Sequence, residues 1–132
     1  MALTYNAVQP VKALTAVGTN QAASNSVGAS ESVTTFGGTS NLLGTTWTPA
    51  DVNDSGFGVI LRFAMTSGTS SYLRATNFGF AIPTNETILG IQFSISAKGA
   101  GAGTASATIS VNYVSCTVTT DLGTTTLGFF LQ

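Results

Sequence analysis

The segment from Asp51 to Gly56 holds the side chains best suited to chemistry. It reads Asp-Val-Asn-Asp-Ser-Gly, which is the oxygen-rich start of a calcium-binding loop. Such a loop needs a bidentate glutamate at its twelfth position, and that position is Arg62. We therefore expect a loop closed by Asx and Ser hydrogen bonds. Asp51 and Asp54 could instead be the carboxylate pair of a glycoside hydrolase, but no second acidic cluster accompanies them.

The other reactive side chains lack the partners that catalysis requires. The chain has no histidine, which excludes Ser-His pairs, Cys-His pairs and His-ligated metals. Its single cysteine, Cys116, follows an apolar strand pattern with no base beside it, so we expect an inert, buried thiol. The sequence therefore predicts a protein that is not an enzyme and that uses no cofactor and no metal.

Three aromatic residues, Tyr5, Trp47 and Tyr72, could form a sugar-binding platform. Such rings pack more often in a core or a subunit interface, and we favour that interpretation. Trp47 precedes a proline and a polar loop, so we expect it to cover one end of the core.

Charge is scarce along the whole chain. Charged residues make up 7% of the 132 residues, whereas about 25% is usual for soluble domains. The basic residues are scattered and form no stripe for phosphates, so we expect no nucleic-acid binding. No stretch approaches the ~18 apolar residues that cross a membrane, and the N-terminus has no signal-peptide pattern. A surface so poor in charge predicts partial cover by neighbouring subunits.

Alternating apolar residues predict a series of β-strands in the chain from Phe36 onward. We expect strands near 57–65, 72–82, 91–95, 104–120 and 127–131, separated by Gly- and Ser-containing turns. In the fourth strand the apolar face changes phase near Tyr113, which indicates a β-bulge or a strand that passes between sheets. The predicted core comprises Phe57, Val59, Leu61, Phe63, Phe78, Phe80, Ile82, Ile91, Phe93, Ile95, Ile109 and Val111.

This pattern predicts an all-β fold, an antiparallel β-sandwich of the jelly-roll kind, without a helical core segment. We assign residues 35–132 to the sandwich and residues 1–34 to an extended N-terminal arm. The start of the arm could form a short strand, but its isolated apolar residues favour docking on a neighbouring chain. The expected assembly interface consists of Leu3, Tyr5, Val8, Val11 and Leu14.

Two stretches resemble a β-sandwich module of tailed-bacteriophage virion proteins. The first, from Phe36 to Leu61, contains LGTTWTPADVN and runs into FGV. The second, from Ser71 to Lys98, contains LRATNFGFAIP followed by TILGI. The resemblance covers roughly two-fifths of the chain and carries no catalytic motif. It implies a structural or appendage role on a phage particle.

A free-standing module of this length suits a capsid decoration or cement protein that stabilises the shell through subunit contacts. The expected partners are further copies of the chain, as a homo-oligomer and specifically a trimer, and virion proteins such as the major capsid protein. The expected location is the virion, after synthesis in the host cytoplasm. The alternative is a tail-fibre or head-fibre module that binds host glycan or protein. A depolymerase is disfavoured because acid, base and metal ligands are missing.

Overall fold

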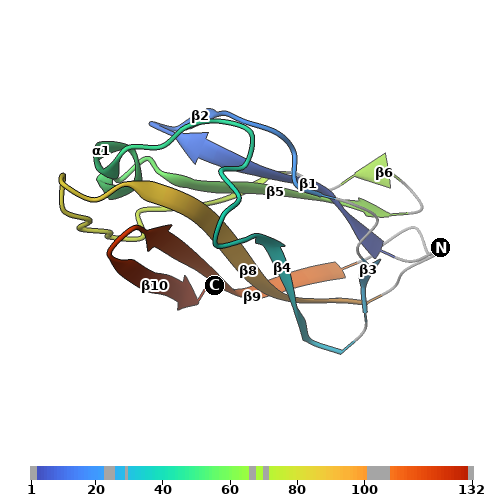
Figure 1. Ribbon diagram of the computed structural model, residues 1–132. Coiled ribbons are helices and arrows are strands. Elements are labelled where there is room, and N and C mark those ends of the chain that lie inside the picture. The colour runs from blue at the N-terminus through green and yellow to red at the C-terminus, as the bar shows by residue number, and fades with distance from the viewer. Residues whose placement is uncertain are drawn as a thin grey trace.

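The computed structural model describes residues 3–22, 26–28, 30–65, 68–69, 72–100 and 108–130. Two antiparallel sheets pack face to face around a shared core (Figure 1). Within the described residues the only helix is α1 (Pro49–Asn53), at one end of the sheets. The prediction of an all-β, sandwich-like fold is confirmed.

The first sheet is centred on two long strands, β1 (Leu3–Lys12) and β5 (Gly58–Met65), which pair antiparallel. The short strands β2 (Thr15–Ala16) and β3 (Ser26–Val27) pair with the other edge of β1. On the far side, β6 (Gly68–Thr69) and β7 (Leu73–Thr76) pair with β5. This sheet therefore joins the start of the chain to its middle.

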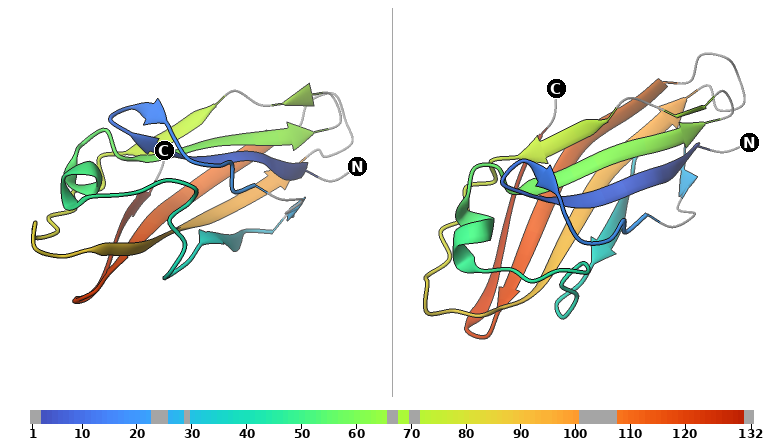
Figure 2. Two further views of the ribbon diagram at one scale, coloured as in Figure 1. Left: turned by 45° about the horizontal axis from the view of Figure 1, so that its top comes forward. Right: turned by 90° about the horizontal axis from the view of Figure 1, so that it is seen from above.

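The second sheet has the order β10-β9-β8-β4. Its strands are β4 (Ser32–Gly37), β8 (Ile88–Ala100), β9 (Thr108–Thr120) and β10 (Gly123–Phe130). The last three follow one another as a meander within one sheet. Figure 2 shows them as a second layer that faces the first sheet. A jelly roll is a pair of Greek keys, so this consecutive order does not confirm that part of our prediction.

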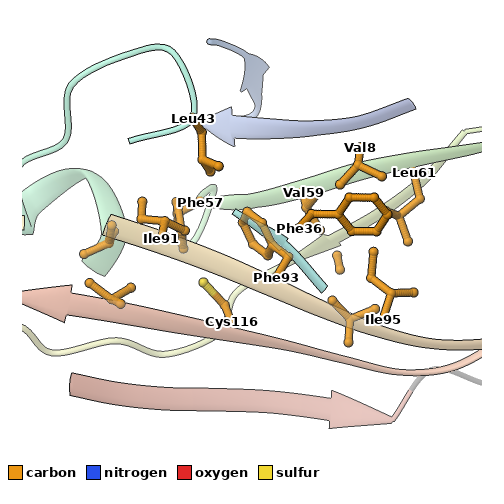
Figure 3. Close-up of a cluster of buried hydrophobic side chains, with 14 of the residues drawn as sticks. Val8, Phe36, Leu43, Phe57, Val59, Leu61, Ile91, Phe93, Ile95 and Cys116 are labelled. Carbon is orange, nitrogen blue, oxygen red and sulfur yellow. The ribbon is translucent and has the colours of Figure 1, made fainter. Parts of the chain in front are cut away.

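One cluster of buried side chains fills the space between the sheets (Figure 3). The side chains of Phe57, Phe63 and Phe93 are fully buried in it. Most of the predicted core is confirmed, although Phe78 is only partly buried and the side chain of Ile109 lies outside the description. Period-2 alternation identified these residues because successive strand side chains point to opposite faces.

The predicted phase change near Tyr113 is a β-bulge in β9. The pairing with β8 shifts between Ser96 and Ala97, which face Tyr113 and Val111, so that Asn112 is an extra residue. As a result Val111 and Val114 are both buried although three positions separate them. A bulge re-aims the strand in this way without breaking the sheet.

The first strand corrects our interpretation of residues 1–34 as an arm. β1 pairs with β5 along most of its length, and the side chains of Tyr5 and Val8 belong to the same core cluster as Phe63. A side chain buried within its own chain is not available to a neighbouring chain. Residues 3–12 therefore form part of the sandwich, and the boundary at residue 34 does not separate two structural units.

Two further segments differ from the sequence-based expectation. The strand expected over residues 72–82 ends at Thr76, because Asn77 and Gly79 adopt positive φ angles of 62° and 87°. Among the described residues, no atom lies within 4 Å of the place where a Cβ of residue 79 would stand. Glycine is therefore favoured at this position by its positive φ angle and not by close contact with another backbone. The helix α1 was not predicted, although its capping box of Thr48 and Asp51 is visible in the sequence.

Candidate functional site

The acidic loop that could have bound calcium is used to cap and brace the fold. Thr48 and Asp51 form a reciprocal capping box, in which the Thr48 amide donates to Asp51 Oδ2 at 2.9 Å. Lys12 Nζ lies 3.4 Å from the same carboxylate oxygen. Burial alone would raise the pKa of Asp51, but the hydrogen bonds with Thr48 and the charge of Lys12 outweigh burial and lower it. This carboxylate is therefore an ionised structural group.

The next two oxygen side chains of the loop are also occupied. Asn53 Nδ2 donates to the carbonyl of Ile82 at 3.0 Å, while its Oδ1 accepts from the Ile82 amide at 2.8 Å. Asp54 Oδ1 accepts from the Gly56 amide at 2.7 Å, which is the expected Asx turn. Among the described residues, no group of His, Cys, Asp and Glu side chains could hold a metal ion.

The three aromatic residues of the possible sugar platform lie apart. Tyr5 is buried between the rings of Phe36 and Phe63, at centroid distances of 5.0 and 4.9 Å. Trp47 is buried at the opposite end of the core, as expected, and donates from Nε1 to the Leu42 carbonyl at 3.0 Å. Only Tyr72 is exposed. A shared platform is therefore not formed.

Cys116 is fully buried on the inner face of β9. Burial raises the pKa of its thiol well above the usual value, because a thiolate would lose its hydration there. The burial of this residue agrees with the prediction of an inert thiol.

The predicted interface residues occupy quite different environments. Tyr5, Val8 and Val11 are buried, whereas Leu14 is 56% exposed in the turn between β1 and β2. Leu3 is the first residue of β1, and its side chain is not among those that the structure describes. The four of these side chains that the structure describes therefore do not share one exposed surface.

The outer face of the second sheet is a partly exposed surface of a different kind, on which Ser115 is buried. Its side chains alternate with core residues such as Phe93 and Cys116, and over the middle of β8 and β9 they are uncharged. Charge is found further along the same face, at the exposed Lys98 of β8 and at Glu31, which accepts hydrogen bonds from Ser96 and Asn112. Thr117 and Thr126 share a hydrogen bond at 2.8 Å, and Thr35 and Ser94 share one at 3.3 Å. We call this surface the hydroxyl face; it comprises Thr35, Gln92, Ser94, Ser115, Thr117, Thr119, Thr124 and Thr126.

The outer face of the first sheet carries a pocket of about 280 Å³ lined by Ile60, Tyr72 and Arg74. Beside it, the guanidinium carbon of Arg62 lies 4.1 Å from the centre of the Tyr72 ring. Arg62 Nε is buried and has no hydrogen-bond partner. We call Ile60, Arg62, Tyr72 and Arg74 the arginine pocket. Sequence reasoning missed it, although Arg62 stood on the polar side of its strand, because the pairing of β5 with β7 was not visible.

No protein-family model matches the chain, and no curated protein or solved structure matches it either. In the part of the chain that the structure describes, no helix has the length and apolar character needed to cross a membrane.

Proposed function

We propose that this chain is a non-enzymatic structural protein of a phage virion, a capsid decoration or cement protein that joins subunits of the shell. The phage location rests on the resemblance of its Phe36–Leu61 and Ser71–Lys98 stretches to virion modules. The role in assembly rests on the hydroxyl face, which supports it independently of that resemblance. We propose further copies of this chain as its first partners, arranged as a trimer.

The hydroxyl face supports assembly because its described side chains offer hydrogen bonds without the cost of burying charge. Moving charged groups out of water is expensive, whereas hydroxyl groups can exchange water for hydroxyl partners on another subunit. Charged side chains on a surface protect a protein against association. The eight positions of the hydroxyl face lack that protection, which supports cover by a neighbour.

This mechanism replaces the docking arm that the sequence suggested. Tyr5 and Val8 stabilise the chain's own core, so subunit contacts must use surfaces that remain exposed. The hydroxyl face is central in the second sheet and spans all four of its strands.

A single lysine in the hydroxyl face tests the proposal. Thr117 lies on a central strand, so Thr117→Lys would place a charge in the proposed contact. We expect the wild-type chain to sediment as an oligomer and Thr117→Lys to shift toward the monomer. Thr84→Lys adds the same charge to an exposed loop and should leave the oligomer intact.

Thermal melting of each variant would confirm that it is folded before sedimentation is interpreted. A wild-type chain that stays monomeric at high concentration would refute self-assembly. Equal dissociation of both lysine variants would show that net charge matters and that the hydroxyl face does not.

A further inference from the structure

We propose that the arginine pocket binds an acidic, extended segment of a partner protein, which adds as a strand to the free edge of β7. This inference deepens the proposed function, because it assigns a chemistry to the partner that is not another copy of this chain. The inference rests on unpaired positive charge, a small pocket with apolar walls, and an open strand edge.

The first observation is that the positive charge of the arginine pocket is unbalanced. In the described part of the chain, the only ion pair joins Lys12 to Asp51. Arg62 and Arg74 therefore have no carboxylate, although they make up half of the four basic residues. Arg62 Nε is also buried without a hydrogen-bond partner. A buried, unsatisfied donor is costly, and it marks the hydrogen-bonding of this guanidinium as incomplete. A carboxylate brought to the pocket would pair with the Arg74 guanidinium through charge-assisted hydrogen bonds.

The second observation concerns the source of that carboxylate. All five acidic side chains already accept hydrogen bonds within this chain, which uses part of the acceptor capacity of each carboxylate. A second copy would have to share these carboxylates with their present donors, so we place the matching acid on a different molecule. The five and their donors are Glu31 with Ser96 and Asn112, Asp51 with Thr48, Asp54 with Gly56, Glu86 with Thr120, and Asp121 with Thr87.

The third observation is the shape of the arginine pocket. Its volume of about 280 Å³ lies just below the range of drug-sized ligand sites, so it suits one side chain rather than a whole ligand. Ile60 and Tyr72 offer apolar contact, and Arg74 offers a cation. Stacking on Arg62 restrains the Tyr72 ring. A glutamate would place its methylene groups on the apolar wall and its carboxylate at the Arg74 guanidinium.

The fourth observation is the strand edge beside the pocket. Among the described strands β7 pairs only with β5, and Figure 2 shows it at the border of the first sheet. An open edge presents backbone N–H and C=O groups that an extended peptide can pair with. Arg74 lies opposite Ile60 in the register, so both project to the outer face. Alternate side chains of an added strand would project to that same face, beside Arg74.

The experiment uses the full chain and a fluorescent peptide with the sequence Thr-Val-Glu-Val-Glu-Val-Thr. A matched peptide with glutamine in place of both glutamates is the ligand control. We expect the acidic peptide to bind, the glutamine peptide to bind about tenfold more weakly, and affinity to fall with added salt. Binding should also slow hydrogen exchange of the amides in Leu73–Thr76.

Variants of the chain separate a specific site from general attraction between charges. Arg74→Gln should weaken binding of the acidic peptide by about tenfold, as expected when one partner of a charge pair is lost. Lys98→Gln removes the same charge from an exposed position outside the pocket and should change affinity by less than about twofold. Equal weakening by both variants, or equal binding of both peptides, would overturn the proposal.

Three further outcomes have a definite meaning. Sialyllactose or glucuronate binding that depends on Arg74, without peptide binding, would replace the protein partner with an acidic glycan. Peptide binding to a chain that sediments as a monomer would uphold this inference and refute self-assembly. An oligomer that binds neither acidic peptide nor acidic sugar would refute this inference and uphold self-assembly.

Discussion

Asn53 shows how one polar side chain holds two distant segments together. It follows the capping box of α1 and pairs with both backbone groups of Ile82, 29 positions later in the chain. Ile82 itself is buried, with 6% of its surface exposed. This pair of hydrogen bonds fixes the irregular segment after β7 to the end of the sandwich, where no ladder partner is available for Ile82.

Replacing Asn53 by alanine should therefore destabilise the protein. The backbone amide and carbonyl of Ile82 would lose their partners, at a cost of about 1–3 kcal/mol in the free energy of unfolding. Asn85→Ala is the matched control, because Asn85 lies in an exposed turn, and we expect a change within about 0.5 kcal/mol. Urea denaturation measures both variants. Equal losses would show that the two hydrogen bonds contribute nothing.

At the scale of elements, β1 is the strand on which the first sheet depends. It pairs with β2 and β3 on one edge and with β5 on the other. The side chain of Val8 is fully buried opposite Leu61, whereas Leu14, just past the end of the strand, is 56% exposed. The same short segment therefore contains one residue that the core requires and one that it does not.

The substitutions Val8→Asp and Leu14→Asp separate these roles. We expect Val8→Asp to lower the free energy of unfolding by about 3 kcal/mol or more, because it buries an unpaired charge. Leu14→Asp should change it by no more than about 0.5 kcal/mol, since Leu14 is exposed and aspartate tolerates its positive φ of 67°. Denaturation curves supply the measurement. Similar small effects at both sites would revive the docking-arm interpretation.

At the scale of the whole molecule, the main feature is the distribution of so little charge. The acidic side chains stabilise loops and turns, and Lys12 pairs with Asp51 at one end of the core. Two arginines remain on the outer face of the first sheet. On the second sheet the eight positions of the hydroxyl face are uncharged, and Lys98 lies beyond them on β8. The two outer faces therefore suit two different partners.

If the hydroxyl face joins copies of the chain, folding and assembly are linked. The melting temperature of the wild-type chain should then rise with protein concentration, because mass action favours the associated native state. The Thr117→Lys variant should lose this dependence, while Thr84→Lys should keep it. Calorimetry or circular dichroism over about a hundredfold range of concentration provides the test. A constant melting temperature for the wild-type chain would contradict the linkage.

The sequence by itself determined the fold class, the core of the later strands and the phase change near Tyr113, although it left a bulge and a strand passing between sheets as alternatives. These features are local, because the direction of a strand side chain follows from its position along the strand. Phe57, Val59 and Leu61 could be assigned to the core without knowing their partners. The phase change between Val111 and Val114 marked the extra residue in the same way.

Only the tertiary structure decided that the start of the chain is a strand of the first sheet and that Arg62 and Arg74 lie on one face of that sheet. The period of β1 is broken by a register shift between Tyr5 and Ala7, so its apolar residues looked isolated. Its neighbour β5 lies some fifty residues further on, and local patterns do not record such long-range pairing. For the same reason the position of Arg62 and Arg74 on one face of the sheet appeared only when β5 and β7 were paired, since pairing in space brings distant residues together.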